Sequence, residues 1–119
     1  MPLPSWFSLK DYQLLQEFAR LTLDSMVYTD AMKREMVGPT IDKFLKNIDE
    51  HENGTIKEKI HMYSAHDFNV ATFIKAHNFT GTPMIPDFGS AIIVEKLKGG
   101  HGMMYIRVII HTWKYLSSL

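Results

Sequence analysis

The sequence lacks cysteine altogether, carries no surplus of charge and contains no long apolar run. Among its 119 residues, thirteen Lys and Arg are balanced by thirteen Asp and Glu. No strongly positive surface for a nucleic acid or an anionic membrane is therefore expected. The longest apolar stretch, residues 103–110, is interrupted by Arg107 and is much shorter than the roughly 20 residues that span a bilayer. We expect neither a nucleic-acid partner nor a membrane span.

The missing cysteines fit a reducing compartment, and they fit equally a fragment whose disulfide-bearing parts lie elsewhere. Residues 1–6 lack the charged and apolar regions of a secretory signal peptide, which taken literally predicts a cytosolic chain. Two N-glycosylation sequons, beginning at Asn53 and Asn78, fall in predicted loops and favour a parent protein of the secretory pathway. The residues alone leave the compartment open.

The amino-terminal half carries amphipathic helical patterns. Ser8 can cap a first helix with Asp11 in its first turn, and one apolar stripe follows at helical spacing: Leu14, Leu15, Phe18 and Leu21. The pattern extends to a predicted stop at Gly38-Pro39, with a break near Thr29-Asp30 as the alternative. A second helix is predicted from Thr40 until Asn53-Gly54.

The second half predicts a strand, a short helix and a hairpin. Residues 60–65 have apolar side chains on both faces, which is typical of a strand covered by helices. Asp67 stands at the expected N-cap of a helix that ends at Asn78. After a breaker-rich loop of residues 80–89, residues 91–97 and 103–112 predict a β-hairpin whose turn is Gly99-Gly100-His101-Gly102. The predicted fold is an α/β (α+β) fragment within one domain, residues 1–119.

His66 and Asp67 are the candidate catalytic site, because they lie where the predicted strand meets the next helix. Ligands of open α/β sheets bind beyond the strand ends, and the first turn of a helix attracts anions. A nearby phosphate would favour a protonated Asp67 carboxyl group, which could then protonate a leaving oxygen while the His66 imidazole holds a phosphate oxygen. Both roles favour acidic pH. The structural alternative is that Asp67 only caps the helix and His66 is a packed histidine.

The other classes of site find little support. The remaining histidines show no spacing typical of metal ligands: His51, His61, His77, His101 and His111. There is no cysteine nucleophile, no G-x-S-x-G elbow and no Gly-rich phosphate loop. We expect no metal and no cofactor.

The six residues Met62-Tyr63-Ser64-Ala65-His66-Asp67 closely resemble the carboxy-terminal signature of the histidine acid phosphatases, the family of the prostatic, lysosomal and insect venom enzymes. Other segments resemble that family in the same order: Leu3-Pro4-Ser5-Trp6, Gly38-Pro39, and Phe88-Gly89-Ser90-Ala91 with Glu95. The resemblance covers nearly the whole chain. It implies the carboxy-terminal part of the histidine phosphatase (phosphoglycerate mutase-like) fold.

The resemblance also implies phosphomonoester hydrolysis through a phosphohistidine, with His66 contacting the phosphate and Asp67 donating the proton to the leaving alcohol. The family's nucleophile lies in an Arg-His-Gly motif, and none of Arg20, Arg34 and Arg107 precedes His-Gly here. We interpret the chain as an incomplete domain, from a partial gene model or a truncated paralogue, that carries half of the site and is nearly inactive alone. A small phosphomonoester would be the substrate, and the parent enzyme would be secreted or lysosomal.

A second hypothesis comes from a different class. A truncated paralogue could act as a non-catalytic module that binds a partner or forms a homodimer, because a strand without parallel neighbours leaves unpaired edges. Stabilisation by phosphate or vanadate would favour the half-site. Concentration-dependent association without an anion effect would favour the module.

Overall fold

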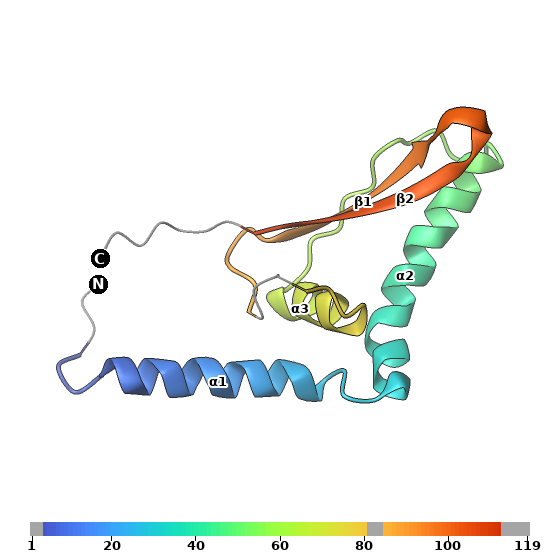
Figure 1. Cartoon of the computed structure of the whole chain (residues 1–119). Helices are drawn as coiled ribbons and strands as arrows, with labels where there is room; N and C mark the ends of the chain where they lie inside the picture. The colour runs from blue at the N-terminus through green and yellow to red at the C-terminus, as the bar shows by residue number, and fades with distance from the viewer. Residues whose placement is uncertain (1–3, 81–84, 113–119) are drawn as a thin grey trace.

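Three helices precede one β-hairpin in the computed structural model, which describes residues 4–80 and 85–112. The elements are α1 (Leu9–Ser25), α2 (Asp30–Glu52), α3 (Asp67–Ala76), β1 (Ala91–Lys98) and β2 (Met104–His111). Figure 1 shows α1 and α2 as two sides of an open angle, with the hairpin above and α3 inside. The mixed α/β character and the hairpin are confirmed. Two predicted features lie outside the described residues: Leu3 of the Leu-Pro-Ser-Trp segment, and residues 81–84 of the predicted loop.

α1 begins where the sequence predicts. Ser8 is the N-cap: its Oγ accepts a hydrogen bond from Asp11 N at 3.3 Å, and Asp11 Oδ2 accepts one from Ser8 N at 2.8 Å. This reciprocal capping box holds the pKa of Asp11 below its usual value, because the bonds from Ser8 favour the carboxylate. The helix ends at Ser25, and Thr29 caps α2 by accepting from Met32 N. The alternative of a break near Thr29-Asp30 is therefore correct.

The predicted stop at Gly38-Pro39 is wrong, and so is a helix start at Thr40. α2 runs from Asp30 to Glu52 with Pro39 inside it. An interior proline typically costs about 3 kcal/mol, but Gly38 has no Cβ to clash with the proline ring, and Val37 is buried in the core. Packing on both sides of the proline outweighs the local penalty. The helix ends at Asn53-Gly54 as predicted, with Gly54 at φ 69°.

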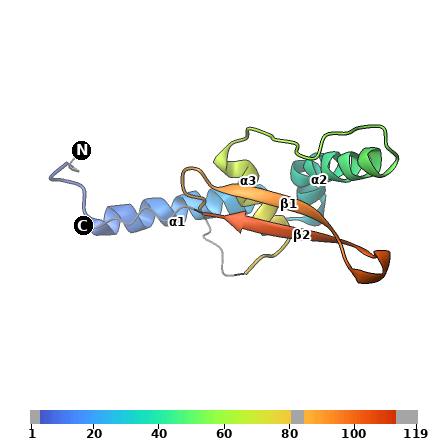
Figure 2. The same ribbon diagram turned by 90° about the horizontal axis from the view of Figure 1, so that it is seen from above.

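The strand predicted at residues 60–65 is absent, which is the main correction to the predicted fold. The segment forms no ladder, and Ile60 and Met62 are 78% and 91% exposed. A covered strand needs hydrogen-bonded neighbours and a helix layer on each face. The described residues supply neither, so the segment runs as an open connection between α2 and α3 (Figures 1 and 2).

The small core gathers around α3. Val27, Val37 and Phe73 are buried together, and partly buried apolar side chains surround them: Ile41, Phe44, Ala76, Ile92 and Val108. The hairpin register pairs Val94 with Val108 and Glu95 with Arg107. Ile92 and Val108 lie on the same face of the hairpin, and this face packs against the helices. Figure 2 shows the hairpin beside α3 when the molecule is seen from above. The core therefore joins α2, α3 and one face of the hairpin.

The molecule is far more open than an ordinary domain. Its radius of gyration is 18.1 Å, whereas a compact chain of this length would have about 13.5 Å. α1 contains no buried residue, although Leu14, Phe18 and Leu21 are on its apolar stripe. Apolar surface that a complete domain would bury is thus left facing water. No helix within the described ranges is long and apolar enough to cross a membrane.

Candidate functional site

The candidate site lies at the start of α3, one residue away from the predicted arrangement. His66, and not Asp67, is the N-cap, with φ −95° and ψ 164°, and Asp67 is the first helical residue. His66 N donates to Asn69 Oδ1 at 3.0 Å, so Asn69 closes the first turn from inside the helix. The predicted strand-to-helix junction is therefore a coil-to-helix junction, and both residues lie at it.

Both candidate side chains are exposed to solvent, which argues against the alternative of a packed histidine. The His66 ring stacks beside the Phe68 ring with centroids 5.6 Å apart and planes at 16°. Asp67 Oδ1 accepts a hydrogen bond from Phe68 N at 2.8 Å. An imidazole and a carboxylate are therefore available to a ligand at the positive end of a helix.

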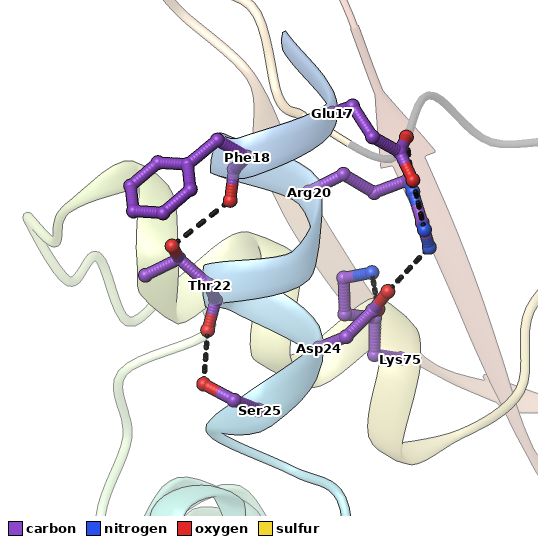
Figure 3. Close-up of polar contacts among 7 residues, drawn as sticks. All are labelled: Glu17, Phe18, Arg20, Thr22, Asp24, Ser25 and Lys75. Carbon is purple, nitrogen blue, oxygen red and sulfur yellow. Dashed lines mark hydrogen bonds and ion pairs between the residues drawn. The ribbon is translucent and has the colours of Figure 1, made fainter. Parts of the chain in front are cut away.

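α3 is held in place by contacts that no local sequence pattern indicated. Lys75, near its carboxyl end, forms an ion pair with Asp24 of α1, although 51 residues separate them, and its side chain is only 11% exposed. Asp24 also accepts from Arg20 at 2.6 Å, and Arg20 bonds Glu17 (Figure 3). These pairings lower the pKa of Glu17 and raise that of Arg20, chiefly through their shared hydrogen bond. A series of ion pairs therefore links α1 to α3, the helix that carries the candidate site.

A second long-range contact holds the segment that leads into the site. Asn47 Nδ2 on α2 donates to Tyr63 Oη at 2.6 Å, and the Phe44 and Tyr63 rings lie 6.0 Å apart. Asn47 is 8% exposed, so this is a buried polar group with a defined partner. The partner lies 16 residues away, beyond the reach of any helical pattern.

The other histidines lie apart from one another in different elements. His51 approaches Lys96 Nζ at 3.1 Å, His77 packs on Phe73 with ring centroids 4.2 Å apart, and His101 turns the hairpin with φ 64°. Within residues 4–80 and 85–112, no three His, Cys, Asp or Glu side chains gather in a way that could hold a metal ion. An open apolar hollow of about 360 Å³ lies elsewhere, at the start of α1, lined by Trp6, Phe7, Asp11, Leu14 and Leu15.

The two sequons lie at exposed turns. Asn53 caps the end of α2, and Asn78 follows α3 with φ 53°. Asn53 N donates to Asp49 O at 2.9 Å and Asn78 N to Lys75 O at 3.1 Å, so the backbone of each is fixed while the side chain faces solvent. Both sequon asparagines are therefore exposed.

Comparison with known proteins identifies the family. The sequence matches the histidine phosphatase superfamily (branch 2) over residues 1–111. The chain belongs to this superfamily. It is also 29% identical over 85 residues to the venom acid phosphatase Acph-1 of the honeybee Apis mellifera, an alignment that covers 70% of this chain and 21% of that protein. No solved structure matches.

This histidine phosphatase chain thus spans about a fifth of the length of the honeybee protein that it matches. The resemblance to the histidine phosphatases is confirmed at the level of the superfamily, and the roles of His66 and Asp67 stay a prediction. Arg20 and Arg107 are each engaged by carboxylates, Glu17 and Asp24 for the first and Glu95 at 2.5 Å for the second.

Proposed function

We propose that this chain is the carboxy-terminal part of an acid phosphatase domain and supplies the half-site that binds phosphate and protonates the leaving alcohol. The observation that carries the proposal is the exposed His66-Asp67 pair at the start of α3, in a chain that matches the superfamily over residues 1–111. The honeybee relative is by name an acid phosphatase. Small phosphomonoesters are the proposed substrates.

Each side chain has a separate role. The His66 imidazole donates a hydrogen bond to a phosphate oxygen, which the positive end of α3 also attracts. A protonated Asp67 donates its proton to the ester oxygen as the bond to phosphorus breaks, so the alcohol leaves neutral. The attacking nucleophile has to come from an Arg-His-Gly segment, which is absent from this sequence. Binding without turnover is therefore the expected property of the chain alone, since its groups cannot replace a nucleophile.

Phosphate titration tests the half-site. We expect the ring resonances of His66 to shift when phosphate or vanadate is added at acidic pH, and the melting temperature to rise. His66→Ala should remove both effects. His61→Ala, which alters another exposed histidine five residues earlier, should keep them. Equal responses in the two variants would disprove a specific role for His66.

An activity assay tests the missing nucleophile. The chain incubated with p-nitrophenyl phosphate at acidic pH should show no turnover. Robust hydrolysis that Asp67→Asn abolishes would overturn the interpretation as a half-site and require a nucleophile within this sequence.

The proposal extends to the parent protein. A secreted or lysosomal enzyme is supported by the venom origin in the honeybee relative's name and by the exposed sequons at Asn53 and Asn78. Expression through a secretory pathway, followed by glycosidase treatment, should show a mass shift that is lost in the Asn53→Gln/Asn78→Gln double variant. If the protein already has the mass calculated from its sequence before the glycosidase is added, neither Asn53 nor Asn78 is glycosylated.

A further inference from the structure

Phe68 contacts both members of the candidate pair at the start of α3. Its ring stacks on the His66 ring, with centroids 5.6 Å apart and planes at 16°. Its backbone N donates to Asp67 Oδ1 at 2.8 Å. The phenylalanine therefore touches the imidazole with its side chain and the carboxylate with its main chain.

Phe68 is itself held in the first turn of α3. Its carbonyl oxygen accepts a hydrogen bond from Thr72 Oγ1 at 2.7 Å, and Thr72 is only 2% exposed. The Phe68 side chain is half-buried, whereas the side chains of His66 and Asp67 are exposed. A half-buried aromatic ring in a formed helical turn has few rotamers open to it. Phe68 is therefore a fixed support beside two side chains that face water.

The freedom that remains to His66 is rotation of its ring. Its backbone N donates to Asn69 Oδ1 at 3.0 Å, which fixes the main chain of the N-cap. An exposed side chain loses rotational freedom when it binds a ligand, and this loss weakens binding. Parallel stacking restricts the ring before the ligand arrives, and it leaves uncovered the ring edge that carries both nitrogens. The stack on Phe68 thus prepares the imidazole to donate to a phosphate oxygen.

We propose that Phe68 is a positioning residue of the half-site, whose ring holds the His66 imidazole in the orientation that binds a phosphate oxygen. Phe68 does not touch the phosphate, because it acts through the histidine. This role rests on the proposed function, since an ordered imidazole matters to phosphate only if His66 binds it. It requires an aromatic side chain at residue 68, whereas an aliphatic one of similar volume would keep the helix and lose the orientation.

A second stacked pair in the chain provides a matched control. His77 stacks on Phe79 beyond the opposite end of α3, with centroids 5.6 Å apart and planes at 13°. The geometry is nearly that of the His66 and Phe68 pair. His77 Nδ1 donates to Phe73 O at 2.8 Å, so this imidazole is already bonded within the protein. Removing the Phe79 ring therefore disturbs an equivalent stack away from the half-site.

Phosphate titration at acidic pH, followed by the His66 ring resonances, tests the proposal. Phe68→Leu should bind phosphate about threefold to tenfold more weakly than the wild type, the range that one aromatic pair contributes. Phe68→Met removes the ring with another side chain of similar volume and should repeat that loss. Phe68→Tyr keeps the ring and should bind within about twofold of the wild type, as should Phe79→Leu.

The ring resonances without phosphate give a readout that a merely structural role would not move. The His66 ring protons should carry a ring-current shift that is kept in Phe68→Tyr and lost in Phe68→Leu and Phe68→Met. Phe79→Leu should instead move the ring protons of His77 and leave those of His66 in place. Circular dichroism should give the same helical content for every variant, because each keeps an apolar side chain of similar volume.

Two results would overturn this role of Phe68: phosphate binding by Phe68→Leu and Phe68→Met that equals the wild type, or binding by Phe68→Tyr that is as weak as theirs. In either case a wild-type chain that binds phosphate through His66 keeps the half-site. A wild-type chain whose His66 resonances do not respond to phosphate would disprove the half-site, and the role of Phe68 with it. The response of the wild type thus separates the two failures.

Discussion

α1 and α3 are both amphipathic helices, but only α3 buries its apolar face. Ala71, Thr72, Phe73 and Ile74 of α3 are all between 1% and 5% exposed. α1 is longer by seven residues and buries none, with Phe18 at 70% exposure. α3 therefore depends on its neighbours, whereas α1 relies on interactions within itself.

The interactions within α1 are local and individually small. They are the capping box at Ser8 and Asp11 and the chain of charges from Glu17 through Arg20 to Asp24. An N-cap contributes about 1 kcal/mol to helix stability, and an ion pair between residues three or four apart contributes a few tenths of a kcal/mol. Packing of an apolar face is the larger source of helix stability in proteins. The contrast shows that α3 is stabilised by packing, whereas the apolar stripe of α1 is exposed.

The largest expected effect compares the two helices directly. Phe73→Ala should reduce the free energy of unfolding by about 3 kcal/mol, because it removes the centre of the core and leaves a cavity. Phe18→Ala should change it by less than about 0.5 kcal/mol, since its ring already faces water. Urea unfolding followed by circular dichroism measures both. Similar losses in the two variants would mean that the α1 stripe is packed in solution.

The next effect concerns the ion pair that joins the two helices. Lys75→Met should cost about 1.5 kcal/mol in the free energy of unfolding, because Asp24 loses a charged hydrogen bond but keeps Arg20. Lys33→Met is the control, since Lys33 pairs with the 84% exposed Asp30 at 3.6 Å, and it should cost only a few tenths of a kcal/mol. A Lys75→Met variant as stable as Lys33→Met would show that α1 and α3 are not joined by this pair.

A smaller effect is expected at the anchor of the α2–α3 connection. Tyr63→Phe should cost about 1 kcal/mol, because it leaves the buried Asn47 amide without its partner. Combining it with Asn47→Leu should recover part of that loss, and the double-mutant cycle gives the coupling. Additive losses in urea unfolding would show that the two side chains do not interact.

The smallest effect is a pH dependence at the carboxyl end of α2. Lys96 of β1 bonds Glu52 and holds the pKa of Glu52 below its usual 4.5. The carboxyl group thus binds its proton less readily in the folded chain, so this contribution to stability is complete above pH 4.5 and is lost as the pH falls through the lowered pKa. The melting temperature should fall slightly less on acidification in Glu52→Gln than in the wild type. Glu35→Gln, at an exposed carboxylate without an ion pair in the described ranges, should behave like the wild type.

Local chemistry was predictable from the sequence, and long-range pairing was not. The cap at Ser8, the hairpin turn and, as an alternative only, the break near Thr29-Asp30 follow from a few neighbouring residues, and the structure contains all three. Pro39 led to the wrong prediction of a helix stop because the energetic penalty of a proline is visible in the local sequence, whereas the packing that offsets it comes from α3. The strand predicted at residues 60–65 was wrong because a strand forms only when a partner strand is present.

The candidate site shows the same division. His66 and Asp67 were placed at the start of a helix from their neighbours alone, with an error of one residue in the N-cap. The hydrogen bond from His66 N to Asn69 Oδ1 was predictable, because the third helical residue commonly accepts a bond from the backbone N–H of the N-cap. The links from Lys75 to Asp24 and from Asn47 to Tyr63 could not, because each joins segments that only the folded chain brings together.

The proline inside α2 leaves one backbone hydrogen bond of the helix unmade. Pro39 has no N–H to offer the carbonyl of Glu35, so one rung of the helical ladder is missing at that point. Val37, in the core, lies just before the gap, and Asn47, which holds Tyr63, lies well after it. Ile41 and Phe44, which follow the gap, pack on the same core as Val37, so side chains hold the two halves of α2 together where the backbone bond is missing.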